Sequence, residues 1–247
     1  MVTRVTFWWS KMSQERDGYR HPGKELAITY SATTLDIRGH RGEAVSNTFF
    51  SQVFEARSLA VIFPGFGYTV QMPVLYYPRL LLLERGADVL VVEYDYREWA
   101  NFRMPRDPER DRWFFDDVAA ACEAGLRRRL YSGVTLVGKS LGTLAMGHLL
   151  TEGLRLPQTQ CIWLTPLLRD DRLRAQIRQA RSRSLFVIGT ADGHYDSAYL
   201  DEVQLASRGE SVVLEDADHS LEIKGDTVGS ICALEQLVQA TQRFLDL

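Results

Sequence analysis

A serine stands between two glycines at residues 138–142, which read Gly-Lys-Ser-Leu-Gly. The aliphatic run 134–138 predicts a buried strand that ends there, and residues 141–153 predict a helix that begins directly after it. A G-x-S-x-G sequence between a strand and a helix is typical of a sharp turn that exposes a nucleophilic serine, and small residues on either side relieve its crowding. We therefore expect Ser140 to be a nucleophile, against the alternative of a strand-to-helix turn without chemistry.

A serine hydroxyl needs a base, and the chain has five histidines, at positions 21, 40, 148, 194 and 219. Only His219 follows the last predicted strand at its carboxyl end, from where its side chain would reach a serine above the sheet. His194 lies in the same layer and is the second choice, or a contact for substrate. His148 falls inside the helix after Ser140, where a packing role is commoner.

The candidate acid is Asp192, which comes just past the penultimate predicted strand. A carboxylate there would accept a hydrogen bond from the imidazole and fix its tautomer. Asp196, four residues on, is the alternative acid. Asp192 also precedes Gly193, and Asp-Gly is a frequent turn pair.

Acyl transfer further requires backbone donors where the carbonyl oxygen becomes negative. The amide of Leu141, directly after the serine, is one candidate. The second is expected from the loop 64–67, because its glycines let the backbone approach closely. Within that loop the amide of Phe66 is the first choice and that of Gly67 the second. The residues expected to contact substrate are Gly65, Gly67, Tyr68 and His194.

These candidates follow strands in a regular alternation of strands and helices. After residue 57 the sequence predicts six short aliphatic strands, at 58–63, 87–96, 134–138, 160–166, 184–190 and 211–217. Helices are predicted at 75–86, from an Asp107 cap up to Gly133, and at 141–153, 168–181, 197–207 and about 227–245. This alternation predicts a parallel sheet with helices on both faces, and functional loops at the carboxyl ends of its strands.

The first 56 residues predict β structure of a different kind. Segments 27–33 and 35–39 are expected to pair as antiparallel strands, and 47–54 to form another strand. The fold class expected is thus α/β, with a doubly wound, mostly parallel sheet and an antiparallel N-terminal β segment. We expect one domain over residues 1–247.

Composition narrows the classes of partner. The chain is 45% apolar and 25% charged with a net charge of −3, which is typical of a globular protein and unfavourable for nucleic-acid binding. No apolar stretch is long enough to span a membrane. Three separate cysteines in apolar contexts, Cys122, Cys161 and Cys232, predict buried free thiols in a reducing compartment. We expect a cytoplasmic protein without nucleic-acid or membrane partners, and leave its oligomeric state open.

From about residue 57 to the end, the chain resembles the serine hydrolases of the α/β-hydrolase fold. The matching pieces are 63–67 (FPGFG), 138–142 (GKSLG), 189–196 (GTADGHYD) and 216–221 (DADHSL). The chain order serine, aspartate, histidine is the one found in that family. The chain is most similar to the small branch with little cap, akin to dienelactone-hydrolase-like esterases.

The resemblance implies roles for particular residues. Ser140 corresponds to the nucleophile, His219 to the base, Asp192 to the acid, and the amides of Phe66 and Leu141 to the oxyanion hole. It implies cleavage of an ester-type bond in a small-molecule acyl substrate, without a metal or organic cofactor. A thioesterase or amidase with the same triad, or a non-catalytic binding protein of the same fold, are the alternatives.

The sequence departs from the family at two points. It also indicates which segments should border the site. Residues 64–65 read Pro-Gly where many relatives have His-Gly, and dienelactone hydrolases proper carry cysteine in place of Ser140. Only about 18 residues, 166–183, lie where the family often inserts a cap, so we expect one helix and no large cap domain. The loop 97–112, with its aromatic residues and Trp113, is expected to form another wall of the site, or else to be plain packing.

Overall fold

The computed structural model describes residues 30–94, 108–152 and 154–246. These residues are built on an eight-stranded sheet. The order across the sheet is β1-β2-β4-β3-β5-β6-β7-β8. Neighbouring strands are antiparallel for β1–β2 and β2–β4 and parallel for every other pair. This confirms the predicted mostly parallel sheet with an antiparallel N-terminal part. The strands are β1 (Tyr30–Thr33), β2 (Asn47–Gln52), β3 (Ser58–Phe63), β4 (Asp88–Val92), β5 (Gly133–Lys139), β6 (Gln158–Leu164), β7 (Arg183–Gly189) and β8 (Glu210–Leu214).

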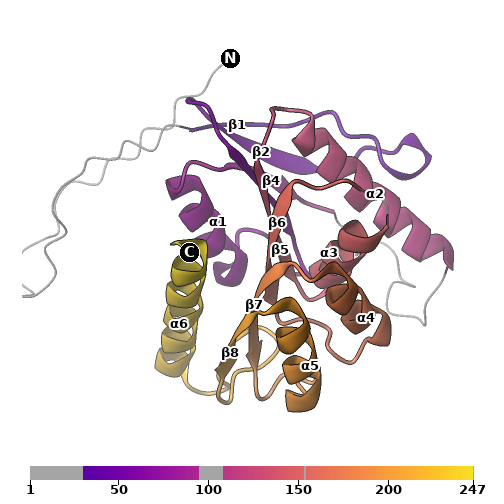
Figure 1. The fold of residues 1–247 in the computed structure, drawn as a ribbon. Coiled ribbons are helices and arrows are strands. Elements are labelled where there is room, and N and C mark those ends of the chain that lie inside the picture. The colour runs from indigo at the N-terminus through magenta and orange to yellow at the C-terminus, as the bar shows by residue number, and fades with distance from the viewer. Residues whose placement is uncertain (1–29, 95–107, 153, 247) are drawn as a thin grey trace, which may run out of the picture.

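Six α-helices of the described residues cover the two faces of the sheet. Helices α1 and α6 lie on one face, and α2, α3, α4 and α5 lie on the other (Figure 1). No helix in the described part of the chain is both long enough and apolar enough to cross a membrane. The helices are α1 (Pro73–Glu84), α2 (Pro108–Leu126), α3 (Leu141–Thr151), α4 (Asp171–Ala180), α5 (Ser197–Ser207) and α6 (Thr227–Asp246).

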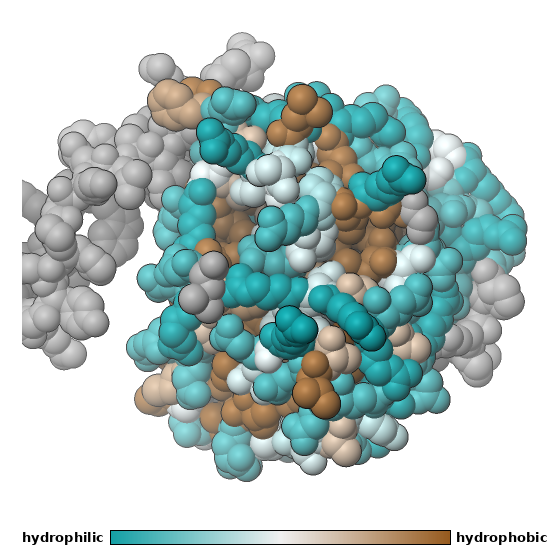
Figure 2. Space-filling model, in the orientation of Figure 1, coloured by the Kyte–Doolittle hydropathy of each residue, from teal (hydrophilic) through white to brown (hydrophobic). Residues whose placement is uncertain are grey.

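The central strands are aliphatic because helices cover them on both sides. All five residues of β4 are buried, as are residues 59–63 of β3. Such strands cannot alternate polar and apolar residues, which is why they read as continuous apolar runs. One core cluster packs between the sheet and helices α2 to α5, and a second packs between the sheet and helices α1 and α6. Figure 2 shows hydrophobic residues in several separate patches on this face of the molecule, surrounded by hydrophilic residues.

The strand predicted at 35–39 is wrong. Strand β1 pairs instead with β2, and segment 35–39 contributes only an isolated bridge between Arg38 and Ala44. The side chain of Asn47 exchanges hydrogen bonds with the backbone of Leu35, which turns this segment into a loop. A short 3-10 helix, η1 (His40–Gly42), continues that loop toward α2.

Some of the predicted segments lie partly or wholly outside the described residues. Residues 27–29 of the first predicted strand, the Asp107 cap, and residues 97–107 with Trp99, Phe102 and Met104 lie outside the described residues. Between β6 and β7, all residues are described, and they hold α4 without a cap domain, as predicted.

The three cysteines differ in exposure. Cys122 and Cys161 are buried free thiols, and burial raises the pKa of both, that of Cys122 to about 12. Cys232 is exposed, so its predicted burial is wrong. The buried residues of α6 recur three or four positions apart, from Ala233 to Phe244, and residue 232 lies outside that stripe.

Helix α3 begins in direct contact with the backbone of the neighbouring strands. A β-carbon built on Gly142 would lie 2.1 Å from the carbonyl oxygen of Phe63 in β3. One built on Gly138 would lie 2.5 Å from the carbonyl oxygen of Gly142. Backbone atoms cannot swing aside as a flexible side chain can, so both positions require glycine. This contact sets the sharp turn from β5 into α3.

We expect Gly142→Ala to lower the free energy of unfolding by about 1–3 kcal/mol, because the new methyl group collides with the backbone of Phe63. Urea unfolding measures the change. The matched control is Gly193→Ala, where an added β-carbon meets no heavy atom within 4 Å. That control should stay within about 0.5 kcal/mol of wild type. Equal stability of the two variants would contradict the steric argument.

Candidate active site

Ser140 occupies the turn between β5 and α3 in a strained conformation. Its φ of 51° and ψ of −114° are unusual for a residue other than glycine, and such strain is concentrated at functional sites. Its amide donates to the carbonyl of Leu164 at 3.0 Å, and its carbonyl accepts from the amide of Thr143 at 2.9 Å. The hydroxyl of Thr143 donates to the same carbonyl at 2.6 Å. The turn is therefore held from both sides.

His219 lies within hydrogen-bonding distance of both its predicted partners. Its Nε2 is 2.8 Å from Oγ of Ser140, and its Nδ1 is 2.7 Å from Oδ2 of Asp192. The three residues follow β5, β8 and β7, at the carboxyl ends of those parallel strands. The structure thus brings together a hydroxyl, an imidazole and a carboxylate that lie far apart in the sequence.

A tight loop after β8 carries His219. Oδ1 of Asp218 accepts from the amides of Ser220 at 2.7 Å and Glu222 at 3.1 Å. The amide of Asp218 donates to the carbonyl of Glu222 at 2.9 Å, and Leu221 is buried with a φ of 61°. These bonds leave the loop little freedom around the histidine.

Asp192 is only 4% exposed, yet its carboxylate has hydrogen-bond donors on both oxygens. Oδ1 accepts from the amide of His194 at 2.9 Å, and Oδ2 faces His219. Burial by itself raises the pKa of Asp192, but the bonds from His219 and from the His194 backbone outweigh it and lower the pKa. The carboxylate therefore stays ionised at neutral pH, as a partner of an imidazolium requires.

Asp196, the alternative acid, is placed elsewhere. It caps α5, where its Oδ1 accepts from the amides of Ala198 at 3.1 Å and Tyr199 at 3.2 Å. The structure brings Asp192 to the imidazole of His219 and uses Asp196 to satisfy a helix N-terminus.

The other candidate histidine, His194, stands beside the triple without a bond to the serine. Its ring centroid lies 5.4 Å from that of His219. Its Nδ1 is buried with no hydrogen-bond partner among the described residues, and burial lowers the pKa of the ring. His148 and His40 are separate, since His148 stacks on Phe115 and His40 pairs with Asp116.

The glycine loop after β3 lies against the serine turn. A β-carbon on Gly65 would be 3.2 Å from Cβ of Ser140, which shows how closely the two backbones approach. The amide of Tyr68 donates to the carbonyl of Gly65, and Gly67 has a φ of 67°. Tyr94 holds the loop from the other side, because its hydroxyl donates to the carbonyl of Pro64 at 2.6 Å. The loop that carries Phe66 is thus fixed beside the serine.

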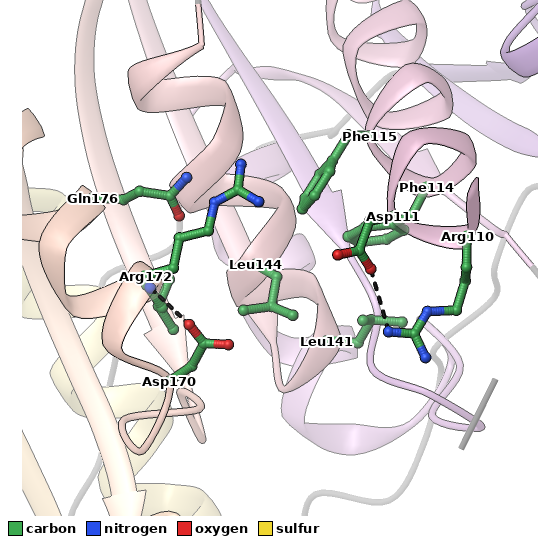
Figure 3. Close-up of a pocket in the computed structure, with 10 residues that line it drawn as sticks. Arg110, Asp111, Phe114, Phe115, Leu141, Leu144, Asp170, Arg172 and Gln176 are labelled. Carbon is green, nitrogen blue, oxygen red and sulfur yellow. Dashed lines mark hydrogen bonds and ion pairs between the residues drawn. The ribbon is translucent and has the colours of Figure 1, made fainter. Parts of the chain in front are cut away.

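Two cavities meet at Leu141, the residue after the serine. The larger, of about 860 Å³, is lined by the glycine loop, including Phe66 and Tyr68, and by Tyr94 and Trp113. The smaller, of about 170 Å³, lies between helices α2, α3 and α4. Figure 3 shows its apolar side chains, Leu141, Leu144 and Phe115 among them, facing one another between charged residues. Its lining comprises Arg110, Asp111, Phe114, Phe115, Leu141, Leu144, Asp170, Arg172, Leu173 and Gln176.

The described residues contain no group of three or more histidine, cysteine, aspartate or glutamate side chains arranged to hold a metal ion. The carboxylate of Asp192 and the imidazole of His219 are bonded to each other.

Sequence reasoning missed Lys139, which it treated as a variable position of the serine motif. The residue is 2% exposed. Its Nζ donates to the carbonyl of His219 at 2.9 Å and to the hydroxyl of Thr165 at 3.3 Å, and lies 4.4 Å from the centre of the Tyr68 ring. Burial lowers the pKa of Lys139 to about 8, against the opposing charges of Asp192 and Asp218. A lysine that ends an aliphatic strand was the available signal.

This buried lysine should make stability depend on pH. The folded chain binds its proton with a pKa of about 8, whereas an unfolded chain binds it near 10.4, so the protonated form costs stability at neutral pH. That cost disappears as the pH rises from about 8 to 10. We expect the unfolding free energy of wild type to rise over this interval, relative to Lys139→Met, by up to about 3 kcal/mol. Urea unfolding at several pH values measures it, and parallel pH curves for the two proteins would contradict it.

Comparison with known proteins places the chain in a family. A family model described as an alpha/beta hydrolase domain matches residues 57–246, and no curated protein sequence matches. An esterase of Pyrococcus furiosus is 13% identical with a TM-score of 0.64, covering 93% of this chain and 96% of that chain. Est1E from Butyrivibrio proteoclasticus is 13% identical with a TM-score of 0.63, covering 86% of this chain and 98% of that chain.

A third similar structure is a putative alpha/beta hydrolase from Agrobacterium tumefaciens. It is 16% identical with a TM-score of 0.66, and covers 87% of this chain and 95% of that chain. At such low identities these similarities concern the fold. The match to the family model extends over most of the chain, from the first parallel strand, β3, to the last helix. The chain therefore belongs to the alpha/beta hydrolase domain family.

Proposed function

We propose that the protein is a serine hydrolase that cleaves an ester-type acyl bond in a small molecule. The observation that carries the proposal is the continuous line of hydrogen-bonding distances from Ser140 through His219 to Asp192, at 2.8 and 2.7 Å. A strained serine, a bonded imidazole and a buried ionised carboxylate are the parts that nucleophilic acyl transfer requires.

In the first step Nε2 of His219 takes the proton of the Ser140 hydroxyl while Oγ attacks the acyl carbonyl. Asp192 keeps the other imidazole proton on Nδ1 and stabilises the imidazolium that forms. The lowered pKa of Asp192 supports this role, because the carboxylate must stay ionised while the ring gains charge.

The negative oxygen of the tetrahedral intermediate then needs donors. The amide of Leu141 would be one donor, which is supported by its position at the start of α3, where unpaired amides and the helix dipole favour negative charge. The loop held against Ser140 supplies the second amide, from Phe66 as first choice and Gly67 as second. The carbonyl of Pro64 accepts a hydrogen bond from the hydroxyl of Tyr94, which supports the position of the loop that carries these amides.

Collapse of the intermediate releases the alcohol with a proton from the imidazolium and leaves an acyl group on Ser140. His219 then takes a proton from water, the resulting attack forms a second intermediate, and the acid is released. This route uses no metal and no organic cofactor. The two cavities, which both have Leu141 in their lining, would receive the two sides of the scissile bond.

An ester is the first substrate class to test. The same triad would serve a thioester or an amide. Est1E, whose fold is similar, was solved with ferulic acid bound, and the similar structure from Pyrococcus furiosus is an esterase. These facts belong to those proteins, and here they only direct the choice of a first substrate panel.

A fluorophosphonate probe tests the nucleophile. We expect it to label wild type and not Ser140→Ala, with the adduct located on Ser140 by mass spectrometry. Hydrolysis of short p-nitrophenyl esters should fall by at least about a thousandfold in the same variant. Equal labelling of both proteins would sink the proposal, and a wild type that is neither labelled nor active would indicate a binding protein of the same fold.

Paired aspartate variants test the acid. Asp192→Asn should lower kcat by roughly three to four orders of magnitude, because an amide no longer holds the correct imidazole tautomer. Asp196→Asn is the matched control, and it should keep kcat within a few-fold, because asparagine caps a helix as well as aspartate does. Ester hydrolysis at neutral pH measures both. A comparable loss in the two variants would show that the acid has been misassigned.

A further inference from the structure

Lys139 links the strand of the serine to the loop of the histidine. It precedes Ser140 in the chain and ends β5, while its Nζ donates to the carbonyl of His219 at 2.9 Å. The path from the serine backbone to the histidine backbone therefore runs through one side chain and one hydrogen bond. The ring of His219 bonds to Ser140 and Asp192, so the ring and the main chain of this residue are each held.

The surroundings of Lys139 show that its ammonium group is accommodated rather than merely trapped. Thr165, the residue directly after β6, accepts a second hydrogen bond at 3.3 Å, and the ring of Tyr68 lies 4.4 Å away. The carboxylates of Asp192 and Asp218 favour its charge. An apolar residue would fill the same volume without the cost of burying a charge, so a role in packing alone does not account for lysine.

We propose that Lys139 is a positioning residue, whose ammonium group fixes the main chain of His219 relative to Ser140 and so keeps the base aligned with the nucleophile. This inference rests on the proposed function, because it concerns the same three side chains. A misplacement of about 1 Å between reacting groups can reduce a rate about a hundredfold, so losing the hydrogen bond from Lys139 that holds the main chain of the histidine should have a measurable effect.

The strength of the hydrogen bond from Lys139 to His219 should depend on pH, because Lys139 can lose its proton. A hydrogen bond from an ammonium group is stronger than one from a neutral amine. Lys139 has a pKa lowered to about 8, and the titratable groups that face it are Asp192, Asp218 and Tyr68. The pKa of Asp192 is lowered, so this carboxylate stays ionised, and burial raises the pKa of Tyr68, so Lys139 changes its charge before Tyr68 does as the pH rises. The bond to His219 then weakens.

The first test compares Lys139→Met with Thr165→Val. Both remove a polar group from the ammonium site, but only Lys139→Met removes the bond to His219. We expect Lys139→Met to reduce kcat and the rate of fluorophosphonate labelling of Ser140 at least about tenfold, with KM within about threefold. Thr165→Val should stay within about threefold of wild type in all three. Labelling of Lys139→Met at the wild-type rate would overturn the inference.

The second test uses wild type itself and so does not depend on the folding of a variant. Its labelling rate should fall several-fold between pH 8 and about 9.5, toward the rate of Lys139→Met, which should lack this decline. A decline of the same size in both proteins would rule out Lys139 as its source.

The third test is independent of turnover. The proton between His219 and Asp192 should give a strongly deshielded NMR signal, as should the pair of His40 and Asp116, and Asp116→Asn identifies the latter. We expect Lys139→Met to broaden or abolish the His219 signal and Thr165→Val to retain it. A sharp, unchanged signal in Lys139→Met would overturn the positioning role even in an active enzyme. If Lys139→Met loses the signal and no probe labels wild type, the proposed function is contradicted but the positioning role is not.

Discussion

The close approach of α3 to the sheet is the constraint on which the candidate site depends. Because the backbones of Gly138, Gly142 and Phe63 come within contact distances that exclude a β-carbon, the chain must turn sharply at Ser140. The turn puts the serine into a conformation with a φ of 51° and places the first amides of α3 beside its hydroxyl. The proposed nucleophile and the proposed oxyanion donor of Leu141 therefore both depend on one packing contact.

Buried charge organises the other half of the site. Asp192 and Lys139 are both almost fully buried, and both contact His219. The ring of His219 is bonded to the carboxylate of Asp192, and its backbone carbonyl is bonded to the ammonium group of Lys139. Each buried charge is costly without partners, so each confines the groups that satisfy it. Orientation of the imidazole is thereby shared between a contact to its ring and a contact to its backbone.

The sequence predicted most elements because their signals are local. Residues 58–63 and 197–207 form β3 and α5 with the predicted ends, since burial on both faces of a sheet demands an aliphatic run and an amphipathic helix repeats its apolar positions. Segment 35–39 failed for the opposite reason. Its alternating pattern fits a strand, but a distant side chain, Asn47, bonds its backbone and makes it a loop. Exposure of Cys232 likewise depends on how α6 faces the sheet.

By itself the sequence determined the chain order of serine, aspartate and histidine, and the strand end that each follows, because turn motifs and strand runs are written in neighbouring residues. Only the tertiary structure decided which aspartate meets the imidazole. Asp192 and Asp196 are four positions apart. Asp196 caps the N-terminus of α5, whereas Asp192 contacts His219 in the loop after β8. It also decided the place of Lys139, since a hydrogen bond between residues 139 and 219 exists only once β5 and the β8 loop are brought together. Contacts between distant segments leave no pattern in a local window, which is why the lysine went unnoticed.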